Sequence, residues 1–201
     1  MNQPIIHMSR IIAVSLFIAL SGCSQISHSD KHTAVPIDTM IKLRLLTYGE
    51  PPQMDWQQAE HVVANRWGIE YLNLAGCAVT RSFTDSVAEH NKMVESLIEQ
   101  KFGSSWKTTF TKEVQEELAK QKVAAALLDT EPLIMAKRTE LEKAGNGLHY
   151  EFTPISKNQY SVSANGWGQS DGKDAYVSFF RYVVDIESKK VTLTRDRITK
   201  E

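Results

Sequence analysis

Cysteine is scarce in this chain, and several other features that would narrow its class are missing. Only two of the 201 residues are cysteine, Cys23 and Cys77. The longest apolar run has about 10 residues, whereas a membrane-spanning helix needs about 20. The charges nearly balance, with 23 lysine and arginine residues against 24 aspartate and glutamate residues and no basic stripe. The sequence therefore gives no indication that nucleic acid or anionic lipid headgroups are partners.

Catalytic and metal-binding motifs are missing as well. There is no HExxH and no close cluster of histidine with carboxylates, so nothing supports a zinc site. A GxSxG spacing occurs at residues 168–172, but a strand is predicted after it, whereas the serine of a nucleophile elbow is followed by a helix, so the spacing does not support a serine triad. The carboxylate pairs Glu116 with Glu117 and Glu140 with Glu142 lie in lysine-rich stretches, which is typical of solvated helix faces. We therefore expect no catalytic residue, no metal and no cofactor, and the pattern favours binding over catalysis.

The clearest pattern lies in the first 23 residues. An apolar run over residues 11–19 leads into Leu20, Ser21, Gly22 and Cys23, so that a leucine precedes a cysteine by three positions with two small residues between them. This pattern resembles the signal sequence of bacterial lipoproteins. The resemblance implies that Leu20, Ser21 and Gly22 are recognised for processing, that the chain is cut before Cys23, and that Cys23 carries the lipid.

The resemblance also implies a location. In lipoproteins the cysteine thiol carries a diacylglyceryl group and the new amino terminus is acylated; each buried CH₂ contributes about 0.8 kcal/mol, so the attachment is effectively permanent. Ser24, in place of aspartate after the cysteine, implies export to the periplasmic face of the outer membrane. In an organism with one membrane the same signal implies the cell surface. Translation starts at either Met1 or Met8. The alternative to a lipoprotein signal is an ordinary secretory signal, with Cys23 as a small residue at its cleavage site.

The remaining chain is expected to form one tethered domain. Residues 1–22 are the signal peptide. Residues 23–35 comprise the lipidated cysteine and a polar segment without periodicity, which predicts a flexible tether. Residues 36–201 are long enough for a single domain with its own core.

Once Cys23 carries lipid, Cys77 is the only other thiol, so no disulfide can form within the chain. Small and apolar residues surround it over residues 72–79, which predicts a buried and inert cysteine. Two alternatives stay open: a disulfide between chains, and a nucleophile with His61 or His90 as its base.

Hydrophobic periodicity predicts helices in the first half of the body and strands in the second. The apolar spacing over residues 37–48 fits a helix slightly better than a strand. Asp55 with Gln58 predicts a capping box at the start of the next helix, and Gly68 its end. Thr84 is the predicted N-cap of a later helix, in which Asn91 lies on the apolar stripe and must find a partner for its amide. The predicted helices cover residues 37–48, 56–67, 85–102, 105–128 and 132–144; the predicted strands cover residues 69–79, 148–152, 159–164, 175–186 and 190–197.

This order of elements predicts an α+β fold, with N-terminal helices packed on a C-terminal antiparallel sheet of about four strands. The short link at Gly103 and Ser104 predicts that the two long helices form an antiparallel pair. In the third strand of the sheet, Phe180 and Phe179 are expected on opposite faces. That strand is expected to be central because both its faces carry apolar residues.

Residues 165–174 are the nearest approach to a functional loop, with three glycines, two carboxylates and a tryptophan. They lack the ligand spacing and terminal glutamate of a calcium loop. The pattern favours a hairpin connection between two strands. The alternative is a partner-binding loop formed by Trp167 with Asp171 and Asp174, because tryptophan buries a large area on a partner at low entropic cost.

Three functions remain open. The favoured one is a membrane-anchored envelope lipoprotein with a non-enzymatic protein-binding domain, of the assembly-accessory or toxin-immunity type. The others are a periplasmic hydrolase with an unrecognised site and a carrier of a small ligand or lipid. The expected partners are the membrane, through the lipid on Cys23, and another protein, but not nucleic acid.

Overall fold

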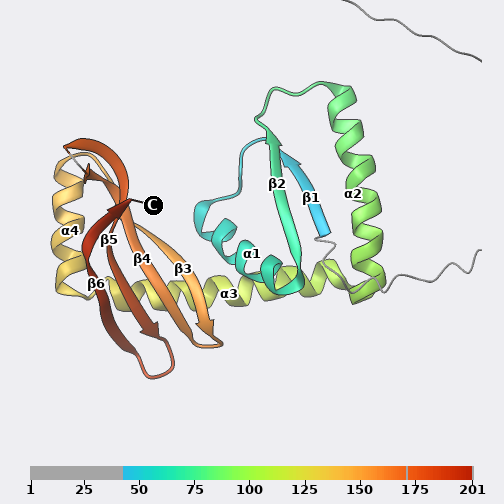
Figure 1. Cartoon of the computed structure of the whole chain (residues 1–201). Coiled ribbons are helices and arrows are strands. Elements are labelled where there is room, and N and C mark those ends of the chain that lie inside the picture. Colours follow the sequence, from blue (N-terminus) through green and yellow to red (C-terminus); the bar gives the residue numbers. More distant parts are fainter. Residues whose placement is uncertain (1–42, 171, 201) are drawn as a thin grey trace, which may run out of the picture. The chain divides into compact units, whose positions relative to one another are not determined.

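Two sheets and four helices make up the part of the chain that the structure describes. This computed structural model describes residues 43–170 and 172–200, so the predicted signal peptide and tether, with Leu20, Ser21, Gly22 and Cys23, lie outside it. The elements are β1 (Leu43–Tyr48), α1 (Met54–Trp67), β2 (Ile69–Ala75), α2 (Arg81–Phe102), α3 (Trp106–Leu128), α4 (Pro132–Lys143), β3 (His149–Ser156), β4 (Gln159–Ser170), β5 (Lys173–Asp185) and β6 (Lys190–Lys200), shown in Figure 1. The α+β class is confirmed, with helices preceding a four-stranded antiparallel sheet.

The first sheet pairs β1 with β2 in parallel, and α1 connects them. Leu43, Leu45 and Ile69 are buried together with side chains of α1, α2 and α3, and these form the first core. The helix predicted over residues 37–48 is therefore wrong for residues 43–48. Apolar residues at positions 43, 45 and 46 fit the periodicity of a helix as well as that of a strand, and the pairing of this segment with β2 makes it a strand. Residues 37–42 lie outside the described residues.

The helix ends are partly as predicted. Gly68 ends α1 in the left-handed conformation, with φ at 71°. The capping box is wrong: Gln53 is the N-cap, and the Asp55 carboxylate accepts a hydrogen bond from the Trp56 amide instead. Helix α2 begins four residues earlier than predicted, because the side chain of Thr80 accepts a hydrogen bond from the amide of residue 83.

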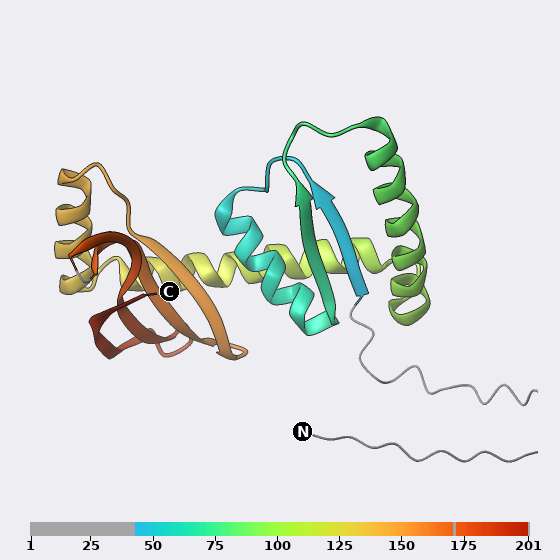
Figure 2. The ribbon, with the colours of Figure 1, turned by 45° about the horizontal axis from the view of Figure 1, so that its top comes forward.

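The two long helices form, but not as an antiparallel pair. Helices α2 and α3 meet at Gly103 and cross steeply in both Figure 1 and Figure 2. Val94 and Ile98 of α2 pack into the first core beside β1, where the Asn91 amide bonds to Leu46. The short link at Gly103 allows α3 to continue at a steep angle to α2 as well as antiparallel to it. The apolar faces of the two helices pack against the first core rather than against each other.

The second core lies between α3, α4 and the antiparallel sheet, whose order is β3-β4-β5-β6, with β5 between two partners as predicted. Helix α3 contributes to both cores. The buried residues of the second core are Ala124, Leu128, Ile134, Leu141, Tyr160, Val162, Ala164, Val177, Phe179, Phe180, Tyr182 and Val184.

A β-bulge changes which side chains of β5 face the second core. Ala164 pairs with Phe180, whereas Asn165 pairs with Ser178, so that Phe179 has no partner on β4. One extra residue reverses the alternation of side chains along the strand. Phe179 and Phe180 therefore both lie in the core, which corrects the prediction that they occupy opposite faces.

A buried carboxylate lies on α3, between the residues of this helix that belong to the first core and those that belong to the second. The Glu117 carboxylate is 4% exposed and accepts hydrogen bonds from Arg66 Nη2 at 3.0 Å and from the Tyr160 hydroxyl at 2.9 Å. Its predicted place on a solvated face is wrong, because the ion pair and hydrogen bonds allow this charge to be buried. The contacts join α1, α3 and β4.

Candidate functional site

Residues 165–174 form part of a β-hairpin rather than a binding loop. Strand β4 continues to Ser170, which pairs with Lys173 at the start of β5, so that only residues 171 and 172 connect the strands. Gly172 has a φ of 73°, a conformation that glycine adopts readily in such turns. Asp171 lies outside the described residues.

The hairpin presents a pair of exposed aromatic side chains. Trp167 is 54% exposed and pairs directly across the strands with Tyr176, which is 39% exposed. Their ring centroids lie 6.0 Å apart in an edge-to-face arrangement, a favourable geometry for aromatic pairs. Two pairs further along, on the same face, Gln169 donates a hydrogen bond to the Asp174 carboxylate. The structure thus brings Trp167 and Asp174 to one face of the hairpin.

The outward direction of Trp167 follows from its two glycine neighbours. Side chains alternate along a strand, so residues 166 and 168 face the second core while Trp167 faces away. A Cβ atom on Gly168 would lie 3.0 Å from two ring carbons of Phe179, and one on Gly166 would lie 2.8 Å from the carbonyl oxygen of Gly147. Only glycine lets the strand approach Phe179 so closely, and this packing holds Trp167 on a well-fixed backbone.

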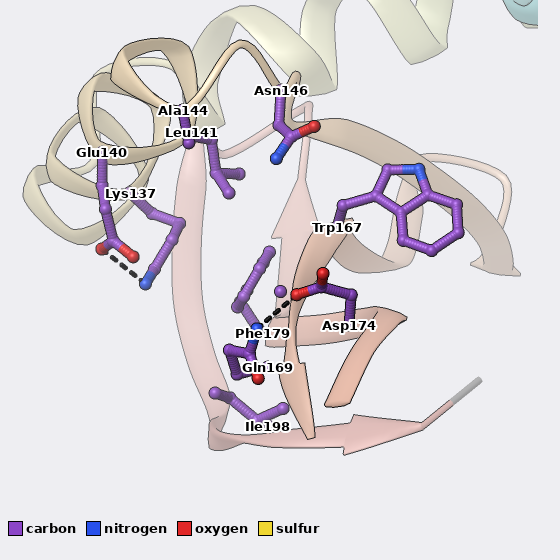
Figure 3. A pocket seen from close by; sticks show the side chains of 11 residues that line it. Lys137, Glu140, Leu141, Ala144, Asn146, Trp167, Gln169, Asp174, Phe179 and Ile198 are labelled. Carbon is purple, nitrogen blue, oxygen red and sulfur yellow. Dashed lines mark hydrogen bonds and ion pairs between the residues drawn. The ribbon is translucent and has the colours of Figure 1, made fainter. Parts of the chain in front are cut away.

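A hollow of about 480 Å³ lies between α4 and the strand ends beside Trp167. Phe179 lines it, and Lys137 Nζ lies 4.8 Å from the centroid of that ring and 2.7 Å from a carboxylate oxygen of Glu140. Figure 3 shows the Trp167 indole directed away from the α4 side chains. The polar side chains that line the hollow are those of Lys137, Glu140, Asn146, Gln169 and Asp174, and apolar side chains make up the rest of its wall.

Polar side chains continue the face that carries Trp167. Arg181 Nε donates to the hydroxyl oxygen of Ser163 at 3.2 Å, and Arg195 Nη2 donates to that of Ser178 at 2.5 Å. The two arginines lie opposite each other on β5 and β6. Glu151 of β3 lies opposite Ser163 on the same face, so the polar area beside the exposed aromatic pair carries charges of both signs.

Cys77 is exposed, which corrects the prediction that it is buried. The apolar residues around it are exposed too, since Leu72 and Leu74 point to the open face of the two-stranded sheet. His90, one of its two suggested bases, has its Nε2 atom 3.0 Å from the carbonyl oxygen of Arg44. Within the described ranges, no three histidine, cysteine or carboxylate side chains are arranged to hold a metal ion.

Sequence reasoning missed Tyr176 and Lys137 as parts of this surface. The partner of Trp167 could have been found, because a hairpin centred on residues 171 and 172 places position 176 opposite position 167. The contact between Lys137 and Phe179 could not, since it depends on how α4 packs against β5.

Searches against protein-family models, curated proteins and solved structures find no match to this chain. Across residues 43–170 and 172–200, no helix has both the length and the apolar character that crossing a membrane requires.

Proposed function

We propose that this chain is an envelope lipoprotein, held by lipid on Cys23 at the periplasmic face of the outer membrane, whose domain binds a partner protein without catalysis. The observation that carries the binding function is the exposed pair Trp167 and Tyr176 on the β4–β5 hairpin. The pattern from Leu20 to Cys23 supports the lipid anchor. Asp174, the hollow beside the hairpin and Arg181 supply polar contacts around the aromatic pair.

The exposed area of Trp167 is large enough to matter for affinity. A tryptophan side chain buries about 150–250 Å² in a well-packed contact, and roughly half of this one is already covered. Covering the remaining ~100 Å² contributes about 2–3 kcal/mol at 25 cal/mol per Å². Since Trp167 is held on a paired strand, little conformational entropy is lost when a partner covers it.

Replacing Trp167 tests this function. We expect Trp167→Ala to weaken the complex with the protein that co-purifies from detergent-solubilised envelopes by about 2 kcal/mol, roughly 30-fold in Kd. Ile155→Ala is a matched control, because Ile155 is 53% exposed on β3 of the same sheet and should leave the affinity unchanged. Equal affinities for the Trp167→Ala variant and the unmodified protein would remove the aromatic pair from the interface.

The same purification distinguishes the two kinds of binding protein proposed, an envelope assembly accessory and a toxin-immunity protein. A partner bound in stoichiometric amounts under all growth conditions supports a role in envelope assembly. A partner bound only after exposure to a delivered toxin supports an immunity function.

A further inference from the structure

Unpaired edge strands invite pairing with other chains, and proteins usually block them. The outer edge of β1 is blocked by α2. Asn91 Nδ2 donates to the carbonyl oxygen of Leu46, whose amide donates back to Asn91 Oδ1, both at 2.8 Å. The side-chain amide thus takes the place of a neighbouring strand, and the ring of the adjacent His90 bonds to the carbonyl oxygen of Arg44, two residues before Leu46 on β1.

Both edges of the antiparallel sheet carry similar protection. On β3, the Gln58 side chain donates to the carbonyl oxygen of Tyr150 at 2.7 Å and accepts from the Phe152 amide at 3.3 Å. Pro154 further along β3 has no amide hydrogen to offer. Strand β6 carries Arg195 and Arg197, and its pairing with β5 is interrupted by two irregularities.

The outer edge of β2 has none of these features. The strand has no lysine, arginine or proline, and its one charge, Glu70, is paired with Arg44 of β1 at 3.0 Å. Within the described part of the chain, no hydrogen bond reaches the β2 backbone from outside β1 and the segments that flank the two strands. Leu72, Asn73 and Leu74 are exposed in succession. The two leucines lie on one face of β2, whereas Asn73, on the other face, lines a hollow with residues of α1.

We propose that two copies of this chain pair through the outer edges of β2, antiparallel about a twofold axis at Asn73. In this register Asn73 lies opposite Asn73 of the second copy, and Leu72 of each copy lies opposite Leu74 of the other. Glu70 falls outside the paired stretch, so no like charges meet across the axis. The two leucine pairs lie on one face and cover the apolar side chains that the single chain leaves exposed.

The protection of β1 explains why this pairing ends at two copies. The joined sheet has the order β1-β2-β2-β1, so both of its outer edges are β1 edges already bonded to Asn91. A symmetric pairing with sealed outer edges is closed and cannot grow into a filament. The proposed partner surface on β4 and β5 takes no part in it.

Cross-linking at single cysteines tests the register. In cells producing the full chain with Asn73→Cys and Cys77→Ser, mild oxidation should give a disulfide-linked dimer, because opposed residues in paired strands have Cα atoms about 4.5–5.5 Å apart. The unmodified chain is the matched control: its Cys77 is also exposed, but lies roughly 25 Å from its counterpart at 3.4 Å per residue and should not cross-link. The Cys77→Ser chain alone must also give no dimer, which separates this test from a failure to lipidate Cys23.

The mass in detergent provides a second test that needs no oxidation. The unmodified chain should sediment as a dimer, Leu72→Lys as a monomer, and Met93→Lys, a change at an exposed position on α2, as a dimer. A monomeric unmodified chain, a cross-link at Cys77 without one at position 73, or a cross-link from position 73 to a different protein or to residues 24–42 would overturn the proposal.

Discussion

At the scale of single residues, the two glycines that flank Trp167 determine how β4 packs against Phe179 and therefore which way Trp167 faces. Trp167 could be selected from the sequence, because an anchor needs a large side chain and few others stand out. Gly166 and Gly168 were assigned to a loop on composition, although they lie in β4 and make room for Phe179. Composition shows that glycine is present, but only the packed neighbour shows why it is needed.

Gly168→Val tests this packing. We expect the free energy of unfolding to fall by about 1–3 kcal/mol, because the new side chain would overlap the Phe179 ring. Gly76→Val is the control: a Cβ atom there meets nothing within 4 Å, and the stability should hardly change. Urea denaturation of both variants measures the difference. Equal stabilities would show that the Phe179 ring is not held against β4.

At the scale of elements, strongly periodic segments could be predicted and their partners could not. Helix α3 begins within one residue of its predicted start, and each of the four predicted strands of the antiparallel sheet forms, but β3 and β4 extend four and six residues beyond their predicted ends. The predicted helix pair failed because a short link is compatible with several crossing angles. The need of Asn91 for a partner was also foreseen, but its identity, Leu46, lies 45 residues away and depends on the fold.

The contact between β4 and α3 should make stability depend on alkaline pH. Burial and the hydrogen bond to Glu117 raise the pKa of Tyr160, and burial with the Asp129 hydrogen bond raises that of Tyr150. Each folded-state pKa is above the unfolded value of about 10, so their contribution is fully present below that pH and is lost as pH rises through the folded-state pKa. The free energy of unfolding should therefore fall above about pH 10, and fall less in Tyr160→Phe. An identical alkaline slope in both proteins would contradict this.

At the scale of the whole molecule, the proposed function combines a lipid anchor, predicted from the pattern that ends at Cys23, with a proposed binding surface on the β4–β5 hairpin. The anchor is tested by Cys23→Ser in cells labelled with a radioactive fatty acid. We expect this variant to carry no label, since no other thiol stands at the processing site, while Cys77→Ser keeps it. Label retained on the Cys23→Ser variant would contradict the lipoprotein assignment.

The most direct test of the binding function is photo-cross-linking in living cells. A photoreactive amino acid replaces Trp167 in one strain and Ile155, which is equally exposed on the same sheet, in another. We predict that illumination links position 167 to one specific protein and leaves position 155 unlinked. No adduct at position 167, or the same adduct at both positions, would contradict a partner-binding surface at the β4–β5 hairpin.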